Sequence, residues 1–550
     1  MHQPEYRDPG SGRFIEPWLL LHALKDYSDM AAHLERAADA RAVVNFSPLV
    51  LDQLEALVEQ LDRLFAGGPP PDEPLLAALV PGGMPEDDGD RRALLQACLR
   101  AHPDHMRERH PPLARLSALA AAELEAPGAA DWLRPGFAAD LVAWYLLAWL
   151  GESVIADDER GGRLRGLERG FTDGERRELL ELVRDTLAGI VPRWRALADA
   201  GRVELACNPW AHPILPLLED FASAREAMPD IELPGGRYPG GAERARWHLE
   251  RARASHAARF GREPVGCWPS EGGVSDASLA AIADAGFAWA ASGQRVLRNS
   301  LDDDAPPGDA LHRPYRAGEA GLVTFFRDDG LSDRIGFEYQ DWCADDAVAD
   351  LVGHLEVIAD DPEGGPDRVV PIVLDGENAW EYYPANAWHF LEALYRELAS
   401  HPRLRLCTFG ECAAAIGDEA PAIDHVVAGS WVHGDFRTWI GDPQKNRAWA
   451  LLLAARAAVD AAVADGAEWN DDLARRLAVC EGSDWFWWPG EYNPGESVAA
   501  FDALFRRHLA GLYRGVGLDP PDELARAFAH GRGEPAAGGV MRTGDADDAV

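Results

Sequence analysis

Lysine is almost absent from the sequence, which holds only Lys25 and Lys445 among its 53 basic residues. Acidic residues number 92 and give the 550-residue chain a formal charge of -39. So large a negative charge argues against a nucleic-acid groove and against adhesion to an anionic membrane. We therefore expect neutral or small partners, with neither nucleic acid nor a membrane among them.

Paired cysteines and long apolar runs are also lacking. The seven cysteines are scattered, and none lies in a C-x-x-C arrangement, which argues against a disulfide framework and against a thiolate zinc site. The most apolar window, 140–151, is too short to cross a bilayer, and no basic segment with an apolar run opens the chain. These features predict a cytoplasmic protein.

Short apolar runs rich in β-branched residues are present, and several are each followed by a loop and a helical pattern. The runs are 41–46, 202–207, 264–268 and 369–374, with further strand candidates at 287–292, 322–327 and 404–409. This alternation predicts a parallel α/β barrel rather than a sandwich. Helix signals stand where they are expected: Pro48 opens one helix, Ser275 or Asp276 caps another that ends before Gly286, and Pro384 precedes a third.

Three segments depart from the barrel pattern. Between about residues 69 and 200 the strand candidates stop and Ala, Leu and Arg recur with a helical period, which predicts a helical insertion in a barrel that spans 1–420. A helical pattern returns afterwards and predicts a C-terminal helical domain over 421–530. The last segment, 531–550, is rich in glycine and poor in large apolar residues, so we expect a disordered tail.

Two acidic residues follow strand candidates closely. Asp375 comes directly after 369–374, in LDGENAWEYYP, and Glu271 lies three residues after 264–268, in GCWPSEGG. A turn or a solvated loop would explain either residue alone. Catalytic residues of a parallel barrel lie at the carboxyl ends of its strands, however, so the two acids are candidates for one active site. His212 follows 202–207 in the same way.

Two facing carboxylates are what cleavage of a glycosidic bond requires, one as the acid and the other as the nucleophile or base. Burial and a like charge both raise the pKa of a carboxyl, so one of the pair can stay protonated near neutral pH. Aromatic residues near the acids would stack on sugar rings. The candidates are Trp268, Trp380, and Trp485 and Trp487 of the run DWFWW; that run is equally consistent with a buried core or interdomain plug.

Several motifs occur in a fixed order along the chain. They are MHQPEYRDP, AHPILPL, WPSEGGVS, LDGENAWEYY, and GSWVHGDFRTWIGDPQKNRAW with EGSDWFWW. With them the sequence resembles glycoside hydrolase family 57, most closely its amylopullulanase-like and α-amylase-like members, up to about residue 519. The resemblance implies a distorted (β/α)7 barrel with a helical insertion and a C-terminal helical domain. It further implies α-glucan cleavage or transfer with retention, without a metal or other cofactor.

The resemblance also assigns residues to roles. It implies that Glu271 is the nucleophile and Asp375 the general acid/base, with Glu377 as the competing carboxylate for the acid. The residues expected to contact the sugar near the cleavage point are His2 and Gln3 of the H-Q-P motif, His212 of H-P-I-L-P-L, and Trp268.

Two departures from the family pattern affect these expectations. In the family a barrel strand ends at the H-Q-P motif, whereas here Met1 directly precedes His2. We expect the start codon to lie further upstream; the alternative is a lost strand and reduced activity. After DWFWW the chain reads PGEYNPGE where related sequences tend to carry an acidic, histidine-containing run, so the preferred chain length stays open.

A retaining α-glucan hydrolase is thus the first prediction, and three alternatives stand beside it. A 4-α-glucanotransferase or branching enzyme would use the same covalent intermediate. A metal-dependent α-mannosidase or deacetylase would need a His/Asp ligand set, yet no two histidines near the motifs lie at ligand spacing on one element. A glycan-binding protein without catalysis would lack a catalytic carboxylate, and both are present. Linkage and oligomeric state stay open.

Overall fold

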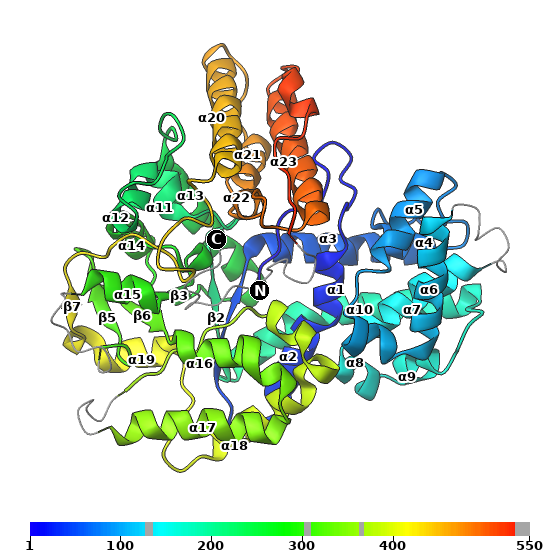
Figure 1. The fold of residues 1–550 in the computed structure, drawn as a ribbon, viewed down its shortest axis with the longest axis horizontal. Helices are drawn as coiled ribbons and strands as arrows, with labels where there is room; N and C mark the ends of the chain where they lie inside the picture. The colour runs from blue at the N-terminus through cyan, green and yellow to red at the C-terminus, as the bar shows by residue number, and fades with distance from the viewer. Residues whose placement is uncertain (127–135, 302–309, 362–367, 534–550) are drawn as a thin grey trace.

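The computed structural model describes residues 1–126, 136–301, 310–361 and 368–533 (Figure 1). Seven strands of these residues form one sheet in the order β1-β2-β3-β4-β6-β5-β7, in which every neighbouring pair is parallel except β5 with β6. The strands are β1 Ala42–Phe46, β2 Val203–Cys207, β3 Gly266–Cys267, β4 Trp289–Gly293, β5 Tyr315–Ala317, β6 Leu322–Arg327 and β7 Ala422–Ile423. The predicted fold class, a distorted (β/α)7-type barrel with additional helices, is confirmed.

Five of the strand predictions correspond to β1, β2, β3, β4 and β6, but two are wrong. Residues 369–374 and 404–409 form no strand of the sheet. The first of these segments makes single backbone bonds instead: the Val369 amide donates to the His312 carbonyl (2.9 Å) and the Asp328 amide to the Pro371 carbonyl (2.8 Å). Pro371 has no amide hydrogen to add to a ladder, so a strand-like composition here does not give a paired strand.

The chain before and after β1 is helical. Two helices, α1 Trp18–Leu24 and α2 Asp26–Arg36, precede β1, and α3 Pro48–Phe65 follows it and begins at the predicted proline. The helices up to β2 are α4 Pro74–Leu79, α5 Asp88–Ala97, η1 Pro103–Glu108, α6 Pro111–Glu125, α7 Phe137–Trp149, α8 Glu152–Asp157, α9 Glu159–Arg165 and α10 Asp173–Asp199. Several of them project to one side of the sheet in Figure 1. They lie in the segment 69–200, which was predicted as a helical insertion. We propose this segment as the bounds of the insertion.

Between β2 and β7 the chain forms further helices. They are α11 Leu215–Glu219, η3 Phe221–Ser223, α12 Ala224–Ala227, α13 Gly241–Phe260, η4 Ser270–Gly272, α14 Asp276–Asp284, α15 Gln294–Ser300, α16 Asp329–Asp333, η5 Arg334–Glu338, η6 Tyr339–Asp341, α17 Ala344–Asp360, η7 Asn378–Tyr382, η8 Pro384–Ala387, α18 Trp388–Ser400, α19 Phe409–Ile416 and η9 Gly417–Glu419. Of these, α13, α14, α15 and α19 pack on the sheet. Ser275 caps α14 as predicted, and Gly286 follows its end with φ +87°. Pro384 begins the short helix η8, which leads directly into α18.

The described C-terminal part is helical and stands above the sheet in Figure 1. Its helices are α20 Pro443–Ala464, α21 Asp471–Cys480, α22 Asp484–Trp487, α23 Gly495–Gly515 and η10 Asp522–Ala525. Residues 534–550 of the predicted tail lie outside the described residues. Just before them, the Arg532 amide donates to the Glu491 carbonyl (2.8 Å) and the Gly533 amide to the Asn493 carbonyl (2.9 Å), so 531–533 pack on the helical part.

A buried ion network joins this helical part to α13. Glu481, fully buried just past α21, accepts hydrogen bonds from Arg244 Nε (2.8 Å), Arg244 Nη2 (2.8 Å) and the ring of His248 (2.8 Å). Burial opposes ionisation of Glu481, but the Arg244 guanidinium and the His248 bond outweigh it and hold the pKa of Glu481 at about 2. The carboxylate is therefore charged and paired under all ordinary conditions.

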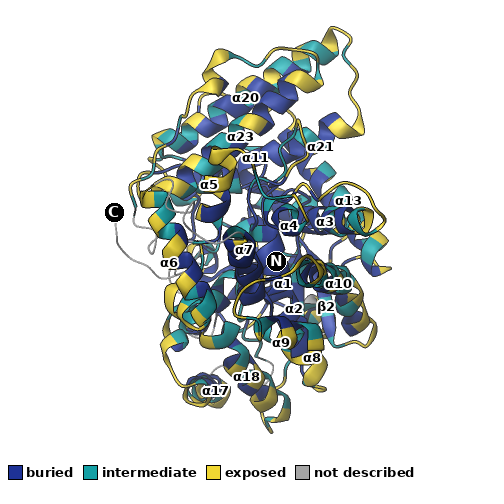
Figure 2. Ribbon diagram, turned by 90° about the vertical axis from the view of Figure 1, so that its right-hand side faces the viewer, coloured by how far each residue is buried: buried dark blue, intermediate teal, exposed yellow. Residues whose placement is uncertain are grey.

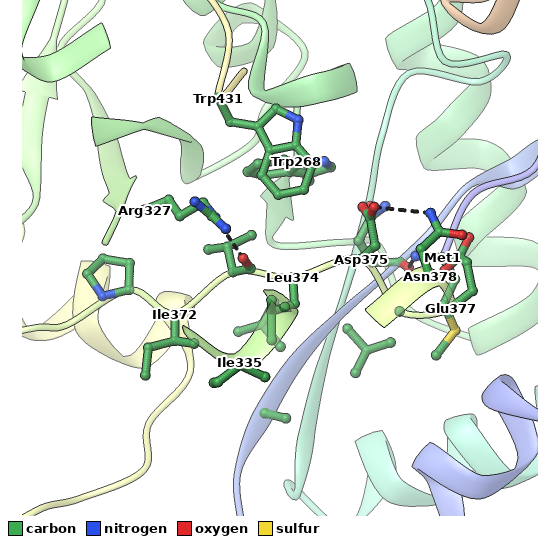
Figure 3. A pocket seen from close by; sticks show the side chains of 18 of the residues that line it. Met1, Trp268, Arg327, Ile335, Ile372, Leu374, Asp375, Glu377, Asn378 and Trp431 are labelled. Atoms are coloured by element: carbon green, nitrogen blue, oxygen red, sulfur yellow. Dashed lines mark hydrogen bonds between the residues drawn. The ribbon is translucent and has the colours of Figure 1, made fainter. Parts of the chain in front are cut away.

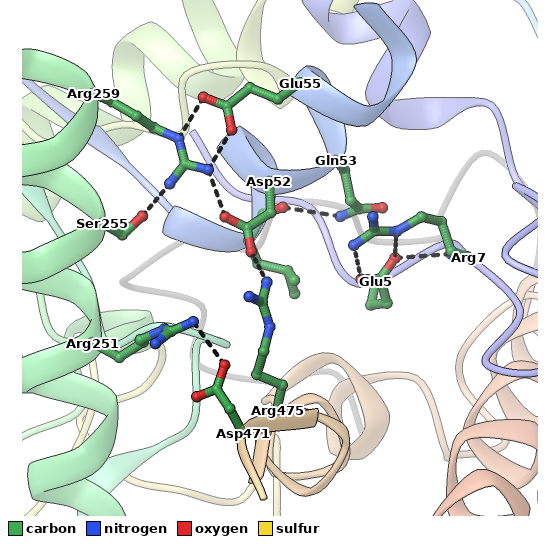
Figure 4. A network of polar contacts seen from close by, with 11 residues as sticks. Glu5, Arg7, Asp52, Gln53, Glu55, Arg251, Ser255, Arg259, Asp471 and Arg475 are labelled. Atoms are coloured by element: carbon green, nitrogen blue, oxygen red, sulfur yellow. Dashed lines mark hydrogen bonds and ion pairs between the residues drawn. The ribbon is translucent and has the colours of Figure 1, made fainter. Parts of the chain in front are cut away.

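A second ion network connects α3 with α13 and α21 (Figure 4). Asp52 of α3 accepts from Arg259 of α13 (2.7 Å) and from Arg475 of α21. Arg259 also reaches Glu55, and Arg251 pairs with Asp471 (3.2 Å). Three helices far apart in the sequence are thereby held together.

The first residue of the chain lies beside β1. The Met1 ammonium donates to the Asn45 carbonyl (2.8 Å), and the Ser47 amide donates to the Met1 carbonyl (2.9 Å). These are the bonds that a parallel neighbour makes with a strand. They bring His2 to the carboxyl end of β1.

Figure 2 shows that the helices differ in how far they are buried. Helix α7 is buried along nearly its whole length, whereas α17 and α20 alternate buried and exposed faces. Both lysines of the chain are buried, Lys25 against Asp26 and Lys445 against the carbonyls of Phe486 and Trp487. Within the described residues, no helix combines the length and the apolar character that a membrane span requires.

Replacing Glu481 by Gln tests the buried network. The change leaves the Arg244 charge buried without its partner, so we expect a loss of about 3–5 kcal/mol in the free energy of unfolding at pH 7. The native pKa of Glu481 lies below its usual value near 4.5, so the stabilisation is complete above that value and fades as the pH falls toward 2. Denaturant midpoints of parent and variant should therefore converge between pH 4.5 and 2.

The matched control is Glu181→Gln, which breaks the exposed pair with Arg177 (3.0 Å) on α10. Exposed pairs of this kind contribute roughly 0.2–1 kcal/mol, so its midpoint should barely move. Equal midpoint shifts for the two variants would contradict an anchoring role for Glu481.

Candidate active site

A cavity of about 2020 Å³ opens at the carboxyl ends of β1, β2 and β3. Eight of the nine predicted site residues line it: His2, Gln3, His212, Trp268, Glu271, Asp375, Trp380 and Trp487. Its volume exceeds the range of roughly 300–1,000 Å³ that is typical of small-ligand pockets. The cavity continues between β1 and the extended segment 369–374, where its walls are apolar.

Glu271 lies in η4, directly after β3, in a conformation that side chains rarely adopt. Its φ and ψ are +56° and 28°, in the left-handed region. Such a backbone costs about 1–3 kcal/mol and is found mostly at functional sites, where the surrounding structure holds it. The indole Nε1–H of Trp431 donates to Glu271 Oε2 (3.2 Å), and the Trp431 amide donates to the Glu271 carbonyl (3.2 Å). The carboxylate therefore has a fixed position on the cavity wall.

Two histidine rings stack beside Glu271. The centroids of His2 and His212 are 3.6 Å apart and the rings are nearly parallel, at 11°. His212, which also has a positive φ of 60°, places Nδ1 2.8 Å from Ser483 Oγ and 3.9 Å from Glu271 Oε1. His2 Nε2 lies 2.9 Å from Asp484 Oδ2. Residues from opposite ends of the sequence thus meet at the catalytic candidate.

Burial lowers the pKa of His212 well below its usual value, and the charges of His2 and the chain's amino group add to the effect. His212 is therefore neutral at all pH values at which the protein would work. A neutral imidazole can donate one hydrogen bond and accept another, which suits contact with a sugar hydroxyl.

Asp375 and Glu377 have different surroundings although only Gly376 separates them (Figure 3). Asp375 Oδ2 accepts from Asn378 Nδ2 (3.1 Å), and the rest of its carboxyl faces the cavity. Glu377 is 3% exposed and its Oε1 accepts from the His2 amide (2.9 Å) and from Gln3 Nε2 (3.3 Å). Glu377 is thus occupied in holding the N-terminal segment, and Asp375 is the better placed of the two for chemistry.

Both candidate catalytic carboxyls have raised pKa values. Burial raises the pKa of Glu271 to about 8, with further contributions from the charges of Asp375 and Asp484, against the lowering effect of hydrogen bonds from Trp431 and Ser483. Burial, followed by the charge of Glu377, raises the pKa of Asp375 to about 6. Neutral pH lies between these two pKa values, so the pair of carboxyls then holds about one proton.

Aromatic rings form the wall beside the acids. Trp268 and Trp431 meet edge to face with centroids 5.5 Å apart, and the guanidinium of Arg327 lies 5.2 Å over the Trp431 ring (Figure 3). Arg327 is itself fixed by Asp329 (2.7 Å) and Asp333 (2.6 Å). Faces of this kind stack on the apolar sides of sugar rings.

The run DWFWW divides between core and cavity. Trp487 and Trp488 line the cavity. Trp485, also predicted to bind substrate, is only 2% exposed, does not line the cavity, and stacks on Phe505 with centroids 5.5 Å apart. Its indole N–H donates to the Val479 carbonyl, so its contacts are those of a core residue.

Four residues of the site were not predicted from the sequence: Ser483, Asp484, Trp431 and Asn378. Ser483 directly precedes the run DWFWW, Asp484 is its first residue, and Trp431 lies in the motif GSWVHGD. The signal in the sequence that could have pointed to such residues is a polar side chain inside an otherwise aromatic or glycine-rich motif. Their partners are too far away in sequence for spacing to reveal them.

Within the described ranges, no group of three or more His, Cys, Asp or Glu side chains is placed to hold a metal ion.

Paired carboxylates in a cavity at the ends of parallel strands, flanked by indoles, are characteristic of barrel enzymes that act on glycosidic bonds. The sequence matches the model of "Glycosyl hydrolase family 57" over residues 1–423, and the chain belongs to that family.

Three solved structures resemble the fold at low sequence identity. The family 57 branching enzyme of Pyrococcus horikoshii is 16% identical, with a TM-score of 0.55 over 94% of this chain and 88% of its own. The branching enzyme of Thermococcus kodakaraensis gives 15% and 0.53 over the same shares. The α-amylase of Thermotoga maritima gives 13% and 0.52 over 96% of this chain and 94% of its own. No curated protein matches the chain.

Replacing Glu271 by Gln tests the electrostatics of the site. Because the native pKa of Glu271 is raised from 4.5 to about 8, the folded state favours the protonated form, and parent stability should fall as the pH rises through this window. The variant cannot ionise there. We expect Glu271→Gln to gain stability relative to the parent between pH 4.5 and 8, by up to a few kcal/mol, in denaturant unfolding.

Asp375→Asn serves as the comparison and should gain over the lower window, from 3.8 to about 6. Parallel stability profiles for the parent and Glu271→Gln across pH 4.5–8 would contradict the assignment of a raised pKa to Glu271.

Proposed function

We propose that the chain is a retaining glycoside hydrolase that acts on α-glucans such as maltodextrin, glycogen or starch. The observation that carries the proposal is the pair of carboxyls, Glu271 and Asp375, whose raised pKa values leave about one proton between them on the wall of a large cavity. One acid and one carboxylate are what double displacement needs. Family membership supports the reaction class.

In the proposed mechanism Glu271 is the nucleophile and Asp375 the general acid/base. Asp375 gives its proton to the glycosidic oxygen while a Glu271 oxygen bonds to the anomeric carbon, which releases the leaving chain and forms a glycosyl ester. Asp375, now a carboxylate, then takes a proton from water as the water oxygen attacks the same carbon. The ester bond to Glu271 breaks, and the configuration is retained.

The resting order of the two pKa values is the reverse of what these roles require, because Glu271 has the higher value, about 8 against about 6. Substrate must therefore move the proton to Asp375. A glycosidic oxygen that accepts from Asp375 stabilises its protonated form, and positive charge developing at the anomeric carbon stabilises ionised Glu271. The hydrogen bond from Trp431 already favours the Glu271 carboxylate.

Aromatic and imidazole groups would hold the sugar in this scheme. We propose that Trp268, Trp380 and Trp487 stack on glucose rings and that His2, His212 and Gln3 contact hydroxyls near the cleavage point. We propose further that the enzyme needs no metal or other cofactor and works in the cytoplasm. The seven cysteines, all free thiols, support a reducing compartment.

A 4-α-glucanotransferase or branching enzyme is the second candidate. The observation that favours it is that two of the structures compared above are branching enzymes. The first half of the mechanism would be unchanged, and a sugar hydroxyl would replace water in the second half.

Maltooligosaccharides and soluble starch test the proposal. With the parent chain we expect products of α configuration by anomer-resolved NMR, and no loss of rate with excess chelator. Glu271→Ala should abolish turnover. Asp375→Ala should lower kcat for these substrates by roughly 10²–10⁴-fold, as loss of a general acid does.

An aryl α-maltoside with a nitrophenol leaving group separates the two roles. Such a leaving group needs no proton, so Asp375→Ala should still release a burst of nitrophenol, whereas Glu271→Ala should release none. Glu377→Gln tests the competing acid, and Glu181→Gln controls for general effects. Products of β configuration, or a burst from Glu271→Ala, would refute the assignment. Longer or α-1,6-branched products would identify the transferase.

A further inference from the structure

Two thiols lie against each other at the start of α19. Cys407 Sγ and Cys412 Sγ are 3.1 Å apart and share a hydrogen bond. Cys412 is buried and Cys407 half-buried, and both line the wall of the large cavity. None of the other five cysteines makes a thiol–thiol hydrogen bond within the described residues, so this pair is distinct in the chain.

The backbone between the two thiols is fixed by several contacts. Thr408 and Glu411 form a reciprocal cap, with bonds of 2.9 and 3.2 Å between each backbone amide and the other side chain. The Gly410 amide donates to Glu204 of β2 (2.7 Å). Phe409 stacks on Phe325 of β6, with centroids 4.3 Å apart. The two sulfur atoms are therefore held at close range by the sheet and the helix cap together.

The two thiols also differ in acidity. The hydrogen bond from Cys412, helped by the charge of Arg405, lowers the pKa of Cys407 to about 7, whereas the same bond and burial raise the pKa of Cys412. A substantial fraction of Cys407 is then thiolate at neutral pH, and the thiolate is the form that attacks disulfides. Cys343, which is exposed, has no thiol beside it, and Cys207 and Cys267 are buried in the sheet.

We propose that Cys407 and Cys412 are a reactive dithiol that forms a reversible disulfide by exchange with a small-molecule disulfide. Cys407 thiolate attacks one sulfur of the small disulfide, forms a mixed disulfide and releases one small thiolate. Cys412 gives up its proton and attacks Cys407 Sγ, which forms the protein disulfide and releases the second small thiolate. Two protein thiols are oxidised and one small disulfide is reduced to two thiols, so electrons and protons balance.

Closure needs little movement. A disulfide brings two sulfur atoms to about 2 Å, so the gap of 3.1 Å shortens by roughly 1 Å. The site is separate from the carboxylate pair in its residues and in its chemistry. It does not depend on the glycosidase proposal.

Peptide mapping of the full-length protein tests the dithiol. After cleavage at arginine, both cysteines fall in one peptide, 406–437, which contains no other cysteine. The protein is equilibrated with graded ratios of reduced to oxidised glutathione and its thiols are then blocked with an alkylating reagent. We expect the peptide to pass from two blocked thiols to none in one step, with a mass lower by about 2 Da than the unblocked dithiol. Added dithiothreitol should reverse the change.

Single variants examine the order of events. Cys412→Ser should accumulate a glutathione mixed disulfide on Cys407, faster than glutathione adds to Cys343. Cys407→Ser should leave Cys412 unmodified, because its raised pKa and burial suppress the thiolate. Cys343→Ser is the matched control and should leave oxidation of the pair unchanged.

Two results would overturn the proposal. One is that peptide 406–437 keeps both thiols at ratios at which Cys343 is already glutathionylated. The other is that the pair is oxidised but dithiothreitol does not reduce it in the folded protein, which would make it a structural disulfide.

Discussion

The buried pairing of Glu481 with Arg244 and His248 is the interaction on which the arrangement of the site depends. A buried carboxylate is tolerated only where its charge and lone pairs are satisfied, so these three groups fix how the C-terminal helices dock on α13. The next polar residues along the chain, Ser483 and Asp484, hydrogen-bond the two stacked histidines. The docking of the C-terminal helices on α13 therefore also sets the orientation of the two imidazole rings.

The triplet Asp375-Gly376-Glu377 divides two tasks between its two acids. Glu377 accepts hydrogen bonds from the backbone of His2 and the side chain of Gln3, so it secures the N-terminal residues that complete the wall. Asp375 remains on the cavity side with a single amide neighbour, Asn378. Gly376 separates them without bulk, since a Cβ there would come within 2.8 Å of the Met1 side chain. A turn alone would need only the first two residues of the triplet.

Sequence reasoning predicted the fold class and singled out two acids that line the cavity, because local patterns express both features. Runs such as 322–327 have the composition of buried strands, and Glu271 and Asp375 occur just beyond such runs. It failed where a partner far along the chain decides the outcome. Residues 369–374 have a strand's composition but find no ladder, and Trp485 belongs to the core only because Phe505 lies beneath it. The bonds of Ser483 and Asp484 span more than 250 residues and leave no local trace.

The two lysines have a consequence for how the molecule can be handled. Lys25 and Lys445 are at most 4% exposed, and each amino group is engaged with neighbouring oxygen atoms. Every other positive side chain of the chain, histidine aside, is a guanidinium. Amine-directed reagents, from succinimidyl dyes to aldehyde supports and acetyl donors, thus have no exposed lysine to attack on the folded protein. Conjugation would have to use carboxyl groups or the exposed thiol of Cys343.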